Sequence, residues 1–153
     1  MRPDDEKICD GLEIAKEKNM EITFYPIMGD VDYHPNTAIV QLRNEIGEMV
    51  KVLGSSIGGG NIQISQINDM PVFFTGQYDS MIVLHKDVPG MIADVTKFLA
   101  KKHINVCSFK LSRMERGGTA VMTIEVDDHI PDNIKSEIMK IKDIINCVII
   151  NKQ

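Results

Sequence analysis

The sequence predicts an α+β protein in two parts, with a boundary between residues 76 and 77. Two observations carry this prediction. Residues 77–153 contain apolar runs and helical repeats in the order strand, helix, strand, strand, helix, strand. Residues 1–76 contain one helical segment, then short alternating segments and a run of glycines. We therefore expect a small mixed α/β domain, followed by a ferredoxin-like βαββαβ domain.

The second part is organised around residues 81–106. An apolar run at 81–84 turns through 85–88, and a helical pattern begins at Pro89. Proline suits the first turn of a helix, because the N–H that it lacks would have no partner there. Gly90 leaves this turn bare, so its N–H groups could receive a ligand carboxylate. The helix is expected to bury one face, made of Ile92, Val95, Leu99 and Lys102 with Met91 and Phe98 beside it.

Two further strands are predicted at 105–114 and 119–127, with a turn at 116–118 between them. Pro131 opens a second helix on Ile134, Ile138, Ile141 and Ile145, and residues 148–150 form the last strand. We expect both helices on one face of the sheet and the strand from Asn105 at its edge. An unpaired edge is a template for another copy, so we expect a homodimer joined through these strands.

The first part is predicted to begin with a helix at 3–19 and a strand at 21–25, followed by a polar loop at 28–36. Strands are expected at 37–43 and 49–53, joined by a hairpin turn. A glycine-rich loop at 54–60 then leads to strands at 61–67 and 71–75.

The glycine-rich loop could hold an anion, because consecutive backbone N–H groups can converge there. It is not a phosphate loop, since neither a Lys-Ser/Thr pair nor a helix follows it. The alternative is a strand connection that needs positive φ. The candidates for anion or substrate-like binding share this loop or the preceding one: His34, Asn36, Thr37, Ser55, Ser56, Gly58, Gly59 and Gly60.

The composition of the chain argues against several classes of function. A net charge of −5 argues against a nucleic-acid partner. No apolar run approaches the roughly 18 residues of a membrane span, and the N-terminus lacks the pattern of a signal peptide, so we expect a cytoplasmic protein. The 3 cysteines form no C-x-x-C pair, so no metal site is expected in this chain. No catalytic constellation is visible, which favours a binding role.

The motif His85-Lys86-Asp87-Val88-Pro89-Gly90, followed by Ile104-Asn105-Val106, resembles the ACT domain. ACT domains are small amino-acid-sensing modules of metabolic enzymes, and the resemblance covers residues 79–152. We expect the Gly90 to Ile92 N–H groups to bind the effector carboxylate and Asp87 to bind its ammonium. The alternative is that Asp87 only caps the helix and Asn105 only turns the chain. The candidates for effector binding are His85, Asp87, Gly90, Met91, Ile92 and Asn105.

The ACT-like unit follows His34-Pro35-Asn36-Thr37 and the glycine-rich segment. Together they resemble the beta subunit of bacterial iron–sulfur-dependent L-serine dehydratase. Residues 1–76 resemble the allosteric substrate-binding domain that this subunit shares with some phosphoglycerate dehydrogenases. The resemblance implies a partner alpha subunit that holds a 4Fe-4S cluster and most catalytic residues. This chain would hold no cofactor, and would sense a small amino acid, with L-serine as the expected effector.

One departure from the family concerns its N-terminal segment, which bears a Gly-Pro-Ser-Ser-Ser-His-Thr motif. Nothing in this chain matches that motif. We therefore expect a beta subunit that lacks its first part and is not catalytic alone. Two alternatives remain open: a stand-alone amino-acid-binding module, and the regulatory tail of a phosphoglycerate dehydrogenase.

Overall fold

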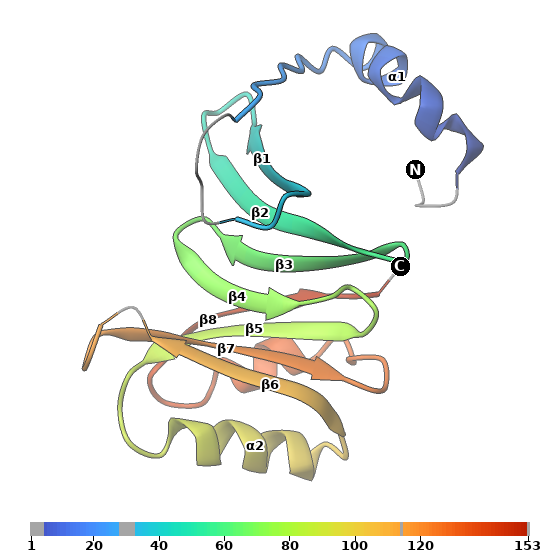
Figure 1. The fold of residues 1–153 in the computed structure, drawn as a ribbon. Coiled ribbons are helices and arrows are strands. Elements are labelled where there is room, and N and C mark those ends of the chain that lie inside the picture. The colour runs from blue at the N-terminus through green and yellow to red at the C-terminus, as the bar shows by residue number, and fades with distance from the viewer. Residues whose placement is uncertain (1–4, 28–32, 114, 153) are drawn as a thin grey trace. The chain divides into compact units, whose positions relative to one another are not determined.

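The computed structural model describes residues 5–27, 33–113 and 115–152, and the chain divides into two compact units. One unit, Met1–Tyr33, holds two helical elements in its described part. The other, His34–Lys152, holds the strands that the structure describes and two further helices (Figure 1). Over the described residues, no helix is both long and apolar enough to cross a membrane.

The N-terminal unit begins with the 3-10 helix η1 (Glu6–Asp10), which continues into α1 (Gly11–Glu17). The Asp5 carboxylate caps η1 by accepting the Lys7 N–H at 2.9 Å. The structure confirms the predicted helix over these residues, while residues 3 and 4 lie outside the described part. The strand predicted at 21–25 is wrong, because these residues adopt no regular structure. Alternation alone does not supply the paired neighbour that a strand needs.

The first sheet has the strand order β1-β2-β3-β4, and all its neighbouring strands are antiparallel. Its strands are β1 (Thr37–Arg43), β2 (Met49–Gly58), β3 (Asn61–Ile67) and β4 (Met70–Phe74). Gly47, at a φ of 87°, closes the predicted hairpin turn, and its N–H donates to the Asn44 carbonyl. Part of residues 28–36, predicted as a polar loop, lies outside the described residues.

The prediction of a loop from residue 54 is wrong, because β2 continues through Gly58. Gly54 pairs with Ile64 across the strands, and a Cβ at residue 54 would lie 2.8 Å from the Ile64 Cδ1. Glycine at this position therefore serves close packing within the sheet. Positive φ occurs only later in this run, at Gly58, which ends β2, and at Gly59 and Gly60 in the turn to β3.

The second sheet has the strand order β6-β7-β5-β8, with antiparallel neighbours throughout. Its elements are β5 (Asp79–Lys86), α2 (Met91–Lys101), β6 (Val106–Arg113), β7 (Thr119–Val126), α3 (Ile134–Ile138) and β8 (Ile144–Ile150). This βαββαβ order confirms the ferredoxin-like prediction. It also confirms that the strand following Asn105 lies at an edge of the sheet.

Both helices cover one face of the second sheet, as predicted. Met91, Val95 and Leu99 form the buried side of α2. Ile92 is 46% exposed, so its predicted place on the buried face is wrong. The second helix is shorter than predicted: it ends at Ile138, and Ile145 belongs to β8. The core on this face contains Met81, Val83, Met91, Val95, Leu99, Met122, Ile124, Val126, Ile130, Ile134, Ile138 and Cys147.

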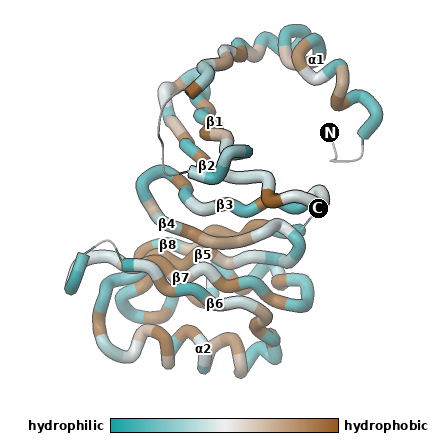
Figure 2. The backbone as a smooth tube through the Cα atoms, in the orientation of Figure 1, coloured by the Kyte–Doolittle hydropathy of each residue, from teal (hydrophilic) through white to brown (hydrophobic). Residues whose placement is uncertain are grey.

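The opposite face of the second sheet packs against the first sheet. Val72 and Phe74 of β4 form a buried cluster with Ile82 and Val121, and Figure 2 shows hydrophobic segments along these strands. The Thr75 N–H donates to the Glu125 Oε1 at 2.9 Å, so a side chain of β7 satisfies a donor next to β4. The boundary predicted between residues 76 and 77 falls in the loop from β4 to β5 and stays a prediction.

Candidate functional site

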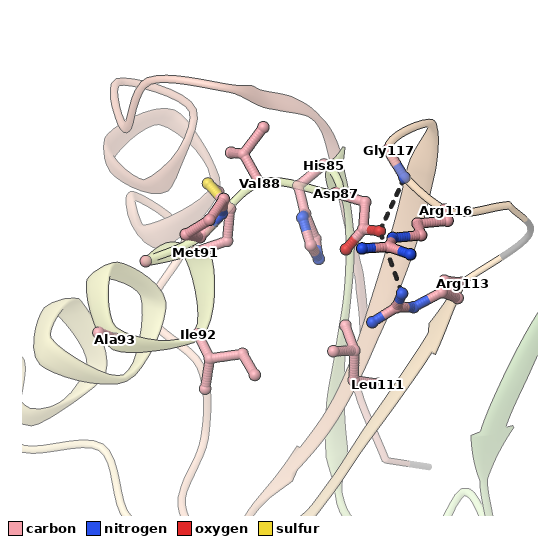
Figure 3. A pocket seen from close by; sticks show the side chains of 12 residues that line it. His85, Asp87, Val88, Met91, Ile92, Ala93, Leu111, Arg113, Arg116 and Gly117 are labelled. Atoms are coloured by element: carbon pink, nitrogen blue, oxygen red, sulfur yellow. Dashed lines mark hydrogen bonds and ion pairs between the residues drawn. The ribbon is translucent and has the colours of Figure 1, made fainter.

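A cavity of about 810 Å³ lies where the end of β5, the start of α2 and the β6–β7 hairpin meet (Figure 3). Its wall combines apolar side chains with a few polar and charged groups, which is typical of small-molecule sites. The lining residues are His85, Asp87, Val88, Pro89, Gly90, Met91, Ile92, Ala93, Leu111, Arg113, Arg116 and Gly117.

The first turn of α2 forms one wall of this cavity. Gly90 is the N-cap residue at a φ of 96°, and because glycine has no side chain it cannot cap the helix N–H groups. The helical bonds start with the Asp94 N–H, which donates to the Gly90 carbonyl at 2.9 Å. The N–H groups of Met91, Ile92 and Ala93 therefore have no acceptor within the helix. They carry the positive end of the helix dipole, which favours an anion.

His85 is 2% exposed and lines the same cavity. Its Nδ1 lies 2.7 Å from the Lys86 carbonyl oxygen. A carbonyl only accepts hydrogen bonds, so Nδ1 is the donor of this pair, and in the neutral form of the ring Nε2 is an acceptor. Nε2 is buried and finds no hydrogen-bond partner among the residues that the structure describes. A ligand donor at this position would remove the cost of an unsatisfied buried acceptor, about 1–3 kcal/mol.

The Asp87 carboxylate is held by the β6–β7 hairpin. Its Oδ2 accepts the Gly117 N–H at 3.0 Å and lies 3.6 Å from the Arg113 Nη1. The Asp87 N–H in turn donates to the Gly118 carbonyl at 2.9 Å. Figure 3 shows the other carboxylate oxygen turned toward His85. Since the N-cap of α2 is Gly90, the alternative in which Asp87 only caps this helix does not describe the structure.

Five of the predicted effector residues, namely His85, Asp87, Gly90, Met91 and Ile92, line this one cavity. Asn105 precedes β6, at the end of this strand remote from Arg113, and its amide donates to the Asp127 carboxylate. Within one chain it is therefore not part of the cavity wall.

Sequence reasoning missed the hairpin wall: Leu111, Arg113, Arg116 and Gly117. The sequence predicted a turn at residues 116–118, but a turn pattern does not indicate ligand binding. The pairing of β6 with β7 is what brings these residues to the cavity.

The anion candidates of the first part divide between two places. His34, Asn36, Thr37 and Ser55 bond to one another: the Asn36 N–H donates to His34 Nδ1 at 3.2 Å, and the Thr37 and Ser55 hydroxyls lie 2.8 Å apart. The Ser56 N–H donates to the Asn36 carbonyl at 2.9 Å. Of the remaining candidates, Gly58 ends β2, and Gly59 and Gly60 form the turn to β3. Anion binding by these residues stays a prediction.

Metal-ligating side chains are dispersed. In the described ranges, no group of three or more His, Cys, Asp and Glu side chains could hold a metal ion. Cys9 and Cys107 are exposed, whereas Cys147 is buried, and burial raises the pKa of the Cys147 thiol to about 11.

The fold and the cavity define the class of domain. A βαββαβ sheet with a ligand-sized cavity at its first strand–helix turn is the arrangement expected of an ACT domain. Residues 81–146 match the family model described as the AHAS small subunit-like ACT domain, which confirms this expectation.

Relatives extend the similarity beyond the ACT domain. The chain is 40% identical over 141 residues to the probable L-serine dehydratase beta chain of Bacillus subtilis, and 30% identical over 141 residues to the L-serine dehydratase beta chain of Peptoniphilus asaccharolyticus. Each match covers 92% of this chain and 63% of the relative. The chain is thus related to L-serine dehydratase beta chains over nearly its whole length, as the sequence motifs predicted.

A second group of relatives matches a smaller part of the chain. The D-3-phosphoglycerate dehydrogenase of Synechocystis is 30% identical over 88 residues, which is 58% of this chain and 16% of that enzyme. A D-3-phosphoglycerate dehydrogenase of Bacillus subtilis matches over a similar share, at 29% identity over 89 residues.

Proposed function

We propose that this chain is a regulatory portion of the beta subunit of an L-serine dehydratase, the lyase that converts L-serine to pyruvate and ammonia. The similarity to two such beta chains over 92% of the chain supports this proposal. The phosphoglycerate dehydrogenase alternative has less support, because those matches reach only 58% of the chain. The third possibility is a stand-alone amino-acid-binding module.

In this proposal catalysis belongs to a partner alpha subunit, which holds the 4Fe-4S cluster and works with this chain in the cytoplasm. The cluster would act there as a Lewis acid on the serine hydroxyl. This chain would sense an amino acid and bias the state of the complex. Such regulation requires that the effector bind one state of the complex better than the other.

The observation that carries the sensing role is the buried, unpartnered Nε2 of His85 in the cavity wall. Figure 3 shows the second Asp87 oxygen, which makes no hydrogen bond among the described residues, turned toward His85. These two acceptors can receive an ammonium group. The N–H groups in the first turn of α2 are donors with partial positive charge, and they can bind a carboxylate. Acceptors on one side and donors on the other fit the two charged groups of an α-amino acid.

Among the described residues β6 pairs only with β7, and this free edge supports the proposal of a homodimer. The cavity lies at the Arg113 end of β6, and Asn105 precedes the opposite end. Antiparallel pairing of two β6 edges would place the start of one strand against the end of the other. Asn105 of the second copy would then approach the cavity and complete its lining. A protein that stays strictly monomeric in sedimentation at high concentration would contradict this arrangement.

Calorimetric titration of the full chain with L-serine, and then with other amino acids, tests the sensing role. The Asp87→Asn variant keeps an oxygen for the Gly117 N–H but loses the charge that binds an ammonium. A charged hydrogen bond contributes about 1.5–3 kcal/mol, so we expect affinity to fall roughly 10- to 150-fold. Asp69→Asn, in the turn between β3 and β4, is the matched control and should bind like the wild type. Equal affinity in wild type and Asp87→Asn would exclude the ammonium subsite.

The subunit role has a separate test. The alpha subunit is assayed for L-serine deamination with and without a complete beta chain, and the complex is challenged with the amino acid that binds in titration. We expect the amino acid to change the activity of the wild-type complex and to act only at higher concentration on the Asp87→Asn complex. Activity that is indifferent to every bound amino acid would contradict regulation by this chain.

A further inference from the structure

The charged groups that line the cavity are unbalanced. Besides the His85 ring they are one carboxylate, Asp87, and two guanidinium groups, Arg113 and Arg116. Both arginines come from the β6–β7 hairpin, and Figure 3 shows them on the same wall as Asp87. The chain as a whole has a net charge of −5, so an excess of positive charge here is a local feature.

The Asp87 charge is already opposed within the wall. Its Oδ2 lies 3.6 Å from the Arg113 Nη1, and the same oxygen accepts the Gly117 N–H. Opposite charges at this separation cancel most of each other's field at longer range. The carboxylate can still accept a hydrogen bond from a ligand through its other oxygen, but the pair as a whole adds little charge to the cavity.

With one carboxylate for two guanidinium groups, the wall keeps one positive charge, which we assign to Arg116. Among the residues that the structure describes, no carboxylate forms an ion pair with its guanidinium. The positive end of α2 faces the same space and adds to this charge. Guanidinium groups present paired donors that match a carboxylate or a phosphate.

The cavity also has room for more than a small amino acid. It is partly open to solvent, and its volume of about 810 Å³ lies toward the upper end of the roughly 300–1,000 Å³ of small-molecule pockets. A ligand whose α-carboxylate binds at the first turn of α2 can therefore carry a longer or larger side chain.

We propose that this cavity selects α-amino acids whose side chain carries a second anionic group, and that Arg116 binds this group. The inference rests on the proposed amino-acid site. The α-carboxylate binds the N–H groups of Met91 to Ala93, and the ammonium binds His85 Nε2 and the unused Asp87 oxygen. The side-chain anion, a carboxylate or a phosphate, then lies against Arg116.

Matched ligand pairs test this selectivity in calorimetric titrations of the full chain. L-asparagine is compared with L-aspartate, and L-serine with O-phospho-L-serine, each at low and at physiological ionic strength. We expect the acidic member of at least one pair to bind 10-fold or more tightly than its neutral partner, with a smaller ratio at higher salt. The pair that shows the larger ratio identifies the carboxylate or the phosphate as the preferred group.

The Arg116→Gln variant tests the assigned residue. It should lose the preference for the acidic ligand, while its affinity for the neutral ligands changes less than twofold. Arg43→Gln removes the same charge from the end of β1 and should keep the preference. Equal binding of neutral and acidic ligands by the wild type would overturn this inference and leave the proposed sensing role intact. Failure of all four amino acids to bind would instead overturn the proposed function, and a preference retained in Arg116→Gln would overturn the role of Arg116.

Discussion

Replacing His85 by phenylalanine should separate the function of this residue from its contribution to stability. The wild-type ring donates one hydrogen bond, from Nδ1 to the Lys86 carbonyl, and buries one unsatisfied acceptor, Nε2. Phenylalanine has a similar planar shape and removes both groups. The Lys86 carbonyl keeps a partner in the variant, because it also accepts the Val88 N–H at 2.9 Å.

The expected change in the free energy of unfolding follows from these two groups. Losing the hydrogen bond costs about 0.5–1.5 kcal/mol, while removing the unsatisfied acceptor returns about 1–3 kcal/mol. The His85→Phe variant should therefore lie between about 0.5 kcal/mol less stable and about 2.5 kcal/mol more stable than the wild type. Its affinity for an amino acid should fall roughly 10- to 150-fold, because the ammonium loses a hydrogen-bond acceptor.

Denaturant unfolding and calorimetric titration of the same samples measure both effects. His103→Asn is the control: His103 has a φ of 57° beyond the end of α2, a conformation that asparagine tolerates. It should change neither quantity appreciably. A His85→Phe variant that binds amino acids like the wild type would refute the role of Nε2. A variant that loses well over 1 kcal/mol of stability would refute the claim that this nitrogen is unsatisfied.

Two further predictions concern the backbone and a buried carboxylate. Gly90→Ala should lose about 1–2 kcal/mol of stability, since alanine at a φ of 96° is strained even though its Cβ would meet open space, whereas Gly11→Ala, at a φ of −56°, should lose none. Asp79 is 2% exposed and accepts the Ile130 and Lys152 N–H groups, each at 2.9 Å. Burial by itself would raise the pKa of Asp79, but these hydrogen bonds and His129 lower it below its ordinary value. Asp79 therefore stabilises the fold fully above its unfolded pKa of about 3.9 and loses this contribution as pH falls through the lower folded value. Asp79→Asn should be less stable than the wild type at pH 6, by about 1–3 kcal/mol, and urea midpoints measured down to pH 2.5 should show this gap shrinking.

Local patterns predicted the second sheet well. The strand and helix order follows from periodicity and turn signals. The ferredoxin-like pattern defined by this order then predicts both helices on one face and β6 at an edge. The errors arise where the secondary structure of a segment depends on a strand that is distant in sequence. The sequence predicts a loop at Gly54, but this residue pairs with Ile64 and belongs to β2. Residues 21–25 alternate like a strand but lack a paired neighbour in the structure.

The candidate site was predicted only on the side that is continuous in sequence. His85 to Ile92 form one segment, so their proximity needs no knowledge of the fold. Arg113 and Arg116 reach the cavity through the register of the β6–β7 hairpin, which the sequence does not specify in advance. Ile92 fits the apolar period of α2, but the cavity at the start of this helix leaves it partly exposed.

The central claim is that an amino acid binds at the first turn of α2 with its carboxylate on the N–H groups there. Amide chemical shifts of the full chain, recorded by NMR during titration with an amino acid that binds in calorimetry, test it most directly. The account predicts that the N–H signals of Met91, Ile92 and Ala93 shift downfield and saturate with the calorimetric affinity, together with the His85 ring signals. Saturable binding that leaves these signals unchanged, or that shifts those of Thr37, Ser55 and Ser56 instead, would contradict the account.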